Sequence, residues 1–424
     1  MADNGDGTPA VASEAAPITA GVRGPRSAFA LLANRNFRLL WTGMLVSHIG
    51  SWMQFTALGY LIDQLTRAPI YLGLLGLSQA IPRLLFVFLG GVAADRLDRR
   101  RVLLVTNAVL MASAGLLAVL AHTGRIQVWH ILAIGAFNSL TNSFDMPARQ
   151  SMVPTLVGEH QLMSALSLNS MAFQGAGMFG PSLGGVLIAT VGVSGCFFVN
   201  TLTYIAVLAA LLMMVVPQHA AGERMSIRED IREGIGLLTQ HRHLIALLAI
   251  VAVISFFGRP YIRLMPAMAR EVLRVGPTGL GLLQAAPAIG TILAVFVVGA
   301  LGHSVQKGRL LIGAVMATGA MVVVFGLSPW FGLSLALLAA VGTCQSVAQA
   351  TANTLLQTTV QPYQRGRMMG LYGMVTFGMF ALGTMPLGAL AGVVGVGHAL
   401  AFGGAMVILL AGLLALLSPK IARL

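Results

Sequence analysis

Long apolar runs recur along this 424-residue chain and leave few folds open to it. A helix needs roughly 20 mainly apolar residues to cross the hydrocarbon core of a bilayer. Only 9% of the residues are charged, against about 25% in soluble domains. The runs between polar breaks number twelve, with approximate cores at 38–63, 71–94, 102–121, 128–149, 163–190, 195–216, 244–269, 279–301, 309–328, 332–354, 367–393 and 398–418. We therefore predict an all-α membrane protein with twelve transmembrane helices.

The longest break between these runs divides them into six and six. Its apolar residues Met225, Ile227, Ile231 and Ile235 follow a spacing typical of an amphipathic helix on a membrane surface. We predict two pseudo-symmetric six-helix bundles with flanking segments: a disordered cytoplasmic tail over 1–35, a bundle over 36–216, a cytoplasmic linker over 217–243 and a bundle over 244–424.

Basic residues are distributed unevenly between the two predicted membrane faces. The tails and the loops on their side hold 19 of the 26 lysines and arginines, and the opposite loops hold 4. Because positive loops stay in the cytoplasm, both termini and the linker are predicted to be cytoplasmic, in a multi-pass protein of the bacterial inner membrane. The net charge of +13 follows from this bias and does not indicate a nucleic-acid partner.

The two predicted halves repeat each other. With a shift of 208 positions, the charged segment 91–104 overlies 299–312. The same shift places Asp145 on Asn353, and Gly175, Gly180 and Gly184 on Gly383, Gly388 and Gly392. A duplicated six-span unit is typical of a secondary transporter with its substrate site between the halves.

Several segments carry a resemblance to a known family. Gly91-x-x-x-Asp95-Arg96-x-Asp98-Arg99-Arg100 resembles the loop motif between spans 2 and 3 of the major facilitator superfamily, whose usual form has Gly where Asp98 stands. The segment 175–185 resembles the span-5 glycine-proline motif of drug:proton antiporters. The strings at 34–41, 145–150 and 365–368 resemble the bacterial branch that contains the enterobactin exporter and macrolide efflux proteins.

The resemblance implies a conformational latch on the cytoplasmic side. In the superfamily, the aspartate that Asp95 matches packs against the start of span 11, where a helix dipole favours an anion. A following arginine reaches an acid at the end of span 4, which Asp145 matches. The predicted latch residues are Gly91, Asp95, Arg96, Arg99, Arg100 and Asp145. The alternative is a charge cluster that only sets the topology.

A second predicted element is the span-5 motif of Gly175, Gly180, Pro181 and Gly184. Small residues allow close helix packing, and proline loosens the hydrogen-bond ladder of a helix. We expect a pliable seam that seals the interface between the halves while they rock. The alternative is ordinary small-residue packing.

Basic side chains inside the spans mark the predicted transport pathway. At 1.5 Å per residue, Arg83 lies roughly 18 Å deep and His48 about 16 Å deep, near mid-bilayer. An intramembrane arginine needs a water-filled cavity or a hydrogen-bonding partner, for which Gln79 is a candidate. We expect Arg259 to face the cavity and Arg263 to reach the lipid headgroups. The cavity arginines would attract an acidic group of the substrate.

Amide side chains extend this predicted cavity. In the superfamily, spans 1, 4, 7 and 10 line the cavity, which implies Asn138, Asn142, Gln345 and Gln349 as lining residues. Their alternative role is hydrogen bonding between helices.

Proton coupling requires a titratable group in the pathway. None of the 13 acids lies clearly at mid-bilayer. The candidates are Asp63, near the outer end of span 1, and His48, because histidine titrates near neutrality. The alternative for His48 is a hydrogen-bonded packing role.

Signatures of other function classes do not occur in the sequence. It has no G-x-x-x-x-G-K-[ST], no H-E-x-x-H and no Cys/His cluster, so we expect no enzyme, metal or cofactor. We predict a monomeric secondary active exporter that moves a small amphipathic molecule across the lipid bilayer by alternating access, coupled to protons. The alternatives are an exporter of a siderophore or other metabolite, an importer, and a non-transporting sensor or scaffold.

Overall fold

The computed structural model describes residues 29–158, 161–214, 242–301, 306–361 and 364–418, and the regular structure in these ranges is helical. Most of the tail predicted over 1–35 lies outside the described residues. The same holds for the linker predicted over 217–243, including its amphipathic helix.

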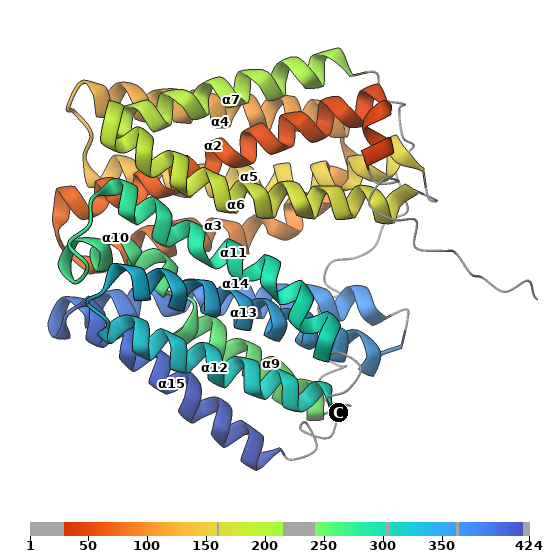
Figure 1. Ribbon diagram of the computed structural model, residues 1–424. Coiled ribbons are helices and arrows are strands. Elements are labelled where there is room, and N and C mark those ends of the chain that lie inside the picture. The colour runs from red at the N-terminus through yellow and green to blue at the C-terminus, as the bar shows by residue number, and fades with distance from the viewer. Residues whose placement is uncertain (1–28, 159–160, 215–241, 302–305, 362–363, 419–424) are drawn as a thin grey trace, which may run out of the picture.

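The helices before the linker are η1 (Ala30–Ala33), α2 (Arg35–Thr66), α3 (Pro69–Arg96), α4 (Arg99–His122), α5 (Val128–Val157), α6 (Leu162–Val191) and α7 (Val193–Met213). Those after it are α9 (Arg242–Val253), η3 (Ile254–Gly258), α10 (Tyr261–Glu271), α11 (Pro277–Leu301), α12 (Lys307–Leu327), α13 (Phe331–Thr359), α14 (Arg365–Val394) and α15 (Val396–Leu417). Figure 1 shows the first set in its upper part and the second set in its lower part.

Nine helical stretches in the described ranges are long and apolar enough to cross a membrane. Helices α2, α5 and α6 have 32, 30 and 30 residues but are not among the nine. Their polar positions lower the mean hydropathy, and α2 and α5 carry the acids Asp63 and Asp145 in their interior. The prediction of an all-helical membrane protein is confirmed.

Local sequence signals position the helix ends. The side chains of Asn34 and Asp98 accept hydrogen bonds from the first backbone N–H groups of α2 and α4. Asn and Asp are strong N-cap residues, so Asp98, which departs from the glycine usual at its place, starts a helix here. Pro69 and Pro277 open α3 and α11, where the missing N–H of proline has no cost.

From α3 onward, the helix boundaries repeat with two offsets. Pro69 and Pro277 begin α3 and α11, 208 residues apart, whereas Val128 and Phe331 begin α5 and α13, 203 residues apart. The difference arises because α12 and the loop after it are together five residues shorter than α4 and its loop. The single offset of 208 is therefore wrong from α5 onward, and Asp145 corresponds to Ala348. By the corrected offset, Gly175, Gly180 and Gly184 correspond to Gly378, Gly383 and Leu387.

The two sets of helices share an apolar core at one end only. One buried cluster joins both sets through residues such as Ile62 and Met268. At the opposite end each set has its own cluster, around Met152 in the first and around Leu355 in the second. We call the end that carries the connections 66–69 and 271–277 the closed end, and the end that carries residues 29 and 418 the terminus end. The ribbons of α6 and α11 diverge toward the terminus end (Figure 1).

Glycines bring the two sets together near the closed end, where α6 packs on α11 and α3 packs on α14. A Cβ atom at Gly185 would lie 3.1 Å from the Cα atom of Gly281, and one at Gly388 would lie 3.4 Å from the Cα atom of Gly73. Small residues allow helix backbones to approach this closely. With the offsets of 208 and 203, Gly73 corresponds to Gly281 and Gly185 to Gly388, so the two contacts are equivalent.

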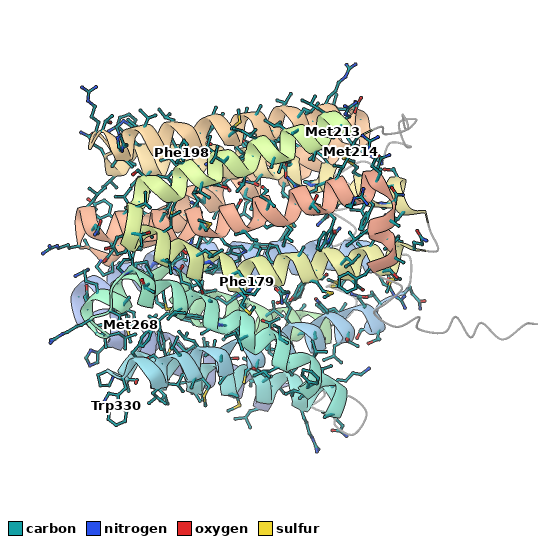
Figure 2. The ribbon with its side chains drawn as sticks, turned by 45° about the horizontal axis from the view of Figure 1, so that its top comes forward. Phe179, Phe198, Met213, Met214, Met268 and Trp330 are labelled. Atoms are coloured by element: carbon teal, nitrogen blue, oxygen red, sulfur yellow. The ribbon has the colours of Figure 1, made fainter. Side chains whose placement is uncertain are left out.

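Large apolar side chains cover the outside of the helices. Phe179 and Phe198 are 54% and 59% exposed, and both are labelled in Figure 2. Trp330 is 72% exposed and lies at the helix start of α13 at the closed end. Such an apolar surface with tryptophan at its edge fits a helix bundle surrounded by lipid.

Candidate functional site

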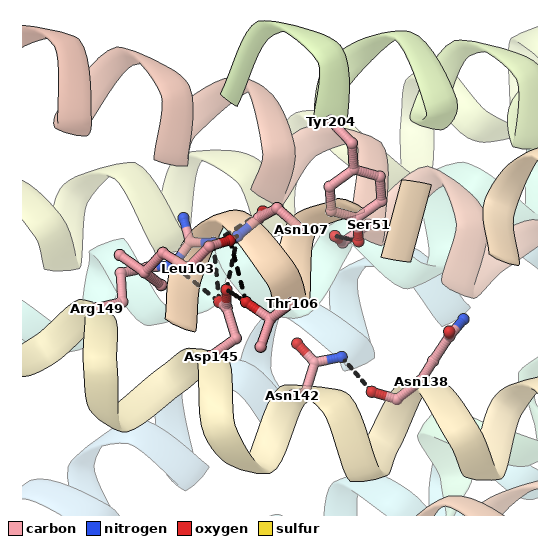
Figure 3. A network of polar contacts seen from close by, with 9 residues as sticks. All are labelled: Ser51, Leu103, Thr106, Asn107, Asn138, Asn142, Asp145, Arg149 and Tyr204. Atoms are coloured by element: carbon pink, nitrogen blue, oxygen red, sulfur yellow. Dashed lines mark hydrogen bonds and ion pairs between the residues drawn. The ribbon is translucent and has the colours of Figure 1, made fainter. Parts of the chain in front are cut away.

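A buried polar network joins α4 to α5 (Figure 3). Oδ1 of Asp145 accepts hydrogen bonds from Thr106 Oγ1 and Asn107 Nδ2, both at 2.8 Å. Oδ2 of Asp145 pairs with Nε and Nη2 of Arg149 at 3.0 and 2.8 Å. All four residues are at least nine-tenths buried, so the carboxylate is satisfied entirely by protein groups.

The structure gives Asp145 a different partner from the one expected. The prediction was a loop arginine, Arg99 or Arg100, but the ion pair is made by Arg149, one turn along the same helix. Arg100 instead donates to the carbonyls of Leu211 and Leu212 at the end of α7, at 2.8 Å each.

The remaining residues of the predicted latch lie around the short connection between α3 and α4. Nη1 of Arg99 donates to the carbonyl of Ser151 on α5 at 2.9 Å. Gly91 has open space where a Cβ atom would stand, and Arg96 is exposed at the last residue of α3. Asp95 stands in the last turn of α3, and its side chain is outside the part that the structure describes.

An ion pair joins the two sets of helices at the closed end. Asp63 on α2 is 3% exposed, and its oxygens accept from Nε and Nη2 of Arg270 on α10 at 2.7 and 3.0 Å. Arg270 also donates to Glu271 at 2.9 Å. The predicted titratable residue Asp63 is therefore held by a charge from the other half of the chain. Sequence reasoning missed Arg270, although it stands 207 residues after Asp63, in the last turn of the equivalent helix.

Arg263 lies between the two sets of helices, and the expectation that it reaches the lipid headgroups is wrong. Its Nη2 donates to Oε1 of Gln79 at 2.5 Å, and its guanidinium lies 4.6 Å from the ring centroid of Phe55. Its Nε is buried without a hydrogen-bond partner. The predicted cavity residue Gln79 therefore binds Arg263 rather than Arg83.

Arg83 joins the two sets of helices at a greater distance from the closed end. Its Nη2 lies 3.4 Å from Sδ of Met146, and its guanidinium lies 4.7 Å from the ring centroid of Phe377 on α14. A cation over an aromatic face gains from the quadrupole of the ring. Helices α3 and α14, which carry these two residues, pack against each other.

A second group of predicted residues meets in a cavity between α9, η3, α12, α13 and α14. Arg259, Gln345 and Gln349 all line it, together with apolar side chains. Arg259 comes from the break between η3 and α10, and the two glutamines come from α13. The structure thus brings together the cavity residues predicted for the second half.

The cavity residues predicted for the first half are more dispersed. The ring of His48 packs edge-on against Phe173 of α6 with centroids 5.6 Å apart. Oδ1 of Asn138 accepts from Ser113 at 2.6 Å, while the side chain of Asn142 is exposed and donates to the backbone carbonyl of Asn138 (Figure 3). Asn138 thus makes an interhelical hydrogen bond, the alternative role expected for it.

The span-5 motif packs α6 against α2. A Cβ atom at Gly180 would lie 3.0 Å from the carbonyl oxygen of Ile49, and one at Gly184 would lie 3.1 Å from the Cα atom of Met53. Gly175 has no heavy atom within 4 Å of that position, so its role is not steric. Pro181 is buried beside Gly281 of α11, where its carbonyl approaches the glycine closely.

Sequence comparison identifies relatives that are efflux proteins. Macrolide efflux protein A of Streptococcus pyogenes is 23% identical over 387 residues, covering 88% of this chain and 94% of the relative. Multidrug efflux pump Tap of Mycolicibacterium fortuitum is 26% identical over 402 residues, covering 91% and 96%. Enterobactin exporter EntS of Citrobacter koseri is 25% identical over 355 residues, covering 84% and 85%.

Structure comparison and a family model agree with these relatives. A solved bacterial homologue of the human lysosomal transporter Spinster superposes with a TM-score of 0.73 at 13% identity, covering 94% of this chain and 98% of the other. The model of the transmembrane secretion effector family matches residues 26–423. The class is therefore a membrane transporter and not an enzyme. The chain belongs to the transmembrane secretion effector family, within the branch of the major facilitator superfamily that includes the macrolide efflux proteins and the enterobactin exporter.

Proposed function

We propose that this protein is a secondary active exporter of small amphipathic molecules. It works as twelve spans in two six-helix bundles, 36–216 and 244–424, that rock against each other as a monomer. One observation carries the proposal: the two sets of helices share a core and an ion pair at the closed end, and have separate cores at the terminus end. A bundle pair closed at one end only is one of the two states that alternating access requires.

The direction of opening follows from the charge bias of the loops. The basic connection 96–101 lies at the terminus end, together with residues 29 and 418. We assign this end to the cytoplasm. The closed end then faces outward, and the state seen here receives its substrate from the cytoplasm. Efflux relatives support export as the direction of net transport.

The opposite state needs a contact that closes the terminus end. We assign this latch to the connection between α3 and α4, with Asp95, Arg99 and Arg100, and to the network around Asp145. The network is buried and joins α4 to α5, so we expect it to hold these two helices together behind the surface that α14 contacts when the bundles rock. Arg149 joins the latch as the charge partner of Asp145.

We assign proton coupling to Asp63 or His48. Asp63 is charge-paired in the state closed to the outside, and protonation of its carboxylate would weaken its contact with Arg270. The pair thus links a titratable group to the outer closure. His48 lies against α6, the helix that carries the glycine seam.

The test uses inside-out vesicles that contain the full-length chain. Uptake of a macrolide, a catecholate and a cationic dye is measured with and without a protonophore, and vesicles without the protein are the control. We expect uptake of at least one compound that collapses with the protonophore. Uptake that survives the protonophore would contradict proton coupling, and no uptake of any compound would favour a sensor or scaffold.

A further inference from the structure

The helix that follows the linker is broken in the middle of its path. Regular α-structure ends at Val253, the π-helical turn η3 runs over Ile254–Gly258, and α10 begins after Pro260. Proline lacks an N–H group and cannot continue a helix ladder. Irregular backbone at membrane depth is tolerated where it lines a cavity, and π-turns are frequent at functional sites. Ile254, Ser255 and Arg259 of this break all line the cavity described above.

Arg259 is a cation without a partner in the described part of the chain. It has no hydrogen bond, ion pair or ring contact with the described residues, unlike Arg83 and Arg263, which lie over phenylalanine rings. A guanidinium does not lose its proton in a protein, so it needs a counter-charge from elsewhere when it is half-buried.

A second donor in the same cavity also lacks a partner. Nε2 of Gln345 is buried with no hydrogen-bond partner. Leaving a buried donor unsatisfied carries a penalty of about 1–3 kcal/mol. Both of these groups are donors, and no carboxylate is among the residues that line the cavity. The cavity therefore lacks a negative charge to balance Arg259, and a bound anion would supply that charge and accept from both donors.

The repeat explains why this cavity exists. With the offset of 203, Asp145 and Arg149 correspond to Ala348 and Ala352, and both alanines line the cavity. In the first half, the equivalent place is filled by the buried ion pair. In the second half, the carboxylate and its arginine are replaced by methyl groups, which leaves room beside Arg259.

We propose that this cavity binds the carboxylate of an amphipathic organic acid, with Arg259 as its charge partner and Gln345 as a second donor. The inference rests on the proposed exporter function and names its substrate class. Arginine recognises carboxylates through two parallel hydrogen bonds. Ile250, Val251 and Leu311 also line the cavity and offer an apolar surface to the body of the acid.

The test measures binding to the purified full-length protein in detergent. The probes are dansylglycine, its uncharged amide and dansyl-methyl phosphate, read by fluorescence. We expect dansylglycine to bind about tenfold more tightly than the amide, an increment of the size that one charged hydrogen-bond pair supplies. Tighter binding of the phosphate than of dansylglycine would overturn the carboxylate assignment. Equal binding of acid and amide, or no binding of either, would overturn the site.

Two variants of Arg259 test whether this residue causes the tighter binding of dansylglycine. Arg259→Gln is expected to remove the preference for the acid. Arg259→Lys is expected to keep part of it, because lysine retains the charge but cannot make two parallel hydrogen bonds to a carboxylate. Arg125→Gln, on an exposed loop at the closed end, is the matched control. A preference that survives in Arg259→Gln would overturn the role of this residue. If vesicles with Arg259→Gln still take up an uncharged compound in a proton-dependent way, the exporter function holds even when the carboxylate site fails. The proposed function and the proposed site can therefore be tested separately.

Discussion

Asp63 on α2 and Arg270 on α10 form a two-point ion pair across the closed end, at 2.7 and 3.0 Å. The two residues occupy equivalent positions in the repeat, because Arg67 and Arg274, four residues after each, are the non-glycine residues with positive φ in the described chain. Each therefore marks the end of the same helix in its own half. The pair ties together the two helices that the proposed opening of the closed end would separate.

Substitution of Asp63 by Asn should loosen the closed end. The amide cannot balance the charge of Arg270, and we expect closure to weaken by about 1–3 kcal/mol, toward the lower value because Arg270 is 36% exposed. The measurement is the distance between spin labels on Leu65→Cys and Arg274→Cys, after Cys196 and Cys344 are replaced by Ala. A distance distribution identical to that of the parent protein would contradict a gating role for the pair.

Removal of one partner from the buried network should destabilise the first half. Arg149→Met leaves the carboxylate of Asp145 buried without its cation, which should lower the stability by about 3–5 kcal/mol. Thermal unfolding in detergent measures this loss. The double variant Asp145→Leu with Arg149→Met should regain most of the stability, because it removes both charges.

The same double variant separates a latch from a structural ion pair. If the network acts as a latch, uptake in inside-out vesicles stays low although the fold is restored. Full recovery of both stability and uptake would show that Asp145 and Arg149 only support packing.

Much of this architecture could be predicted from the sequence, because hydrophobic length and helix signals are local. Asn34, Asp98, Pro69 and Pro277 mark helix starts by their own chemistry. The membrane class follows from the apolar runs alone. The family motifs led to the same branch that the comparisons identify.

The partners of the buried charged side chains could not be predicted in the same way, because they depend on how each helix is rotated and on the register between the two halves. Asp145 pairs with Arg149, at a spacing of four that predicts contact on one helix face, whereas the family motif pointed to an arginine of the loop. Arg263 faces the interface between the halves rather than lipid, which the sequence of α10 does not show. The repeat offset changes by five residues across α12 and the loop after it, and this change hid the match between Asp145 and Ala348.

Bulk added at the glycine contact between α6 and α11 should prevent full closure. Gly185→Val introduces side-chain atoms where the backbone of α11 already lies within contact distance, at a cost of about 1–3 kcal/mol. Leu61 is buried in the core of the closed end, so labelling of Leu61→Cys from the outer side should become faster. Gly175→Ala is the matched control, because open space surrounds that position, and it should leave the labelling rate unchanged. A rate that is equal in both variants would contradict a sealing role for this seam.

An aspartate introduced into the cavity of the second half should take the place of the ligand's carboxylate as the counter-charge of Arg259. Ala348→Asp restores there the residue that α5 carries at Asp145, and its carboxylate would lie in the cavity that Arg259 lines. We expect the protein to lose its preference for dansylglycine over the amide, because the counter-charge of Arg259 is then supplied from within. Ala348→Asn has nearly the same shape without the charge, and it should retain a preference for the acid. If the aspartate and asparagine variants bind the acid equally well, Arg259 does not select the substrate by charge.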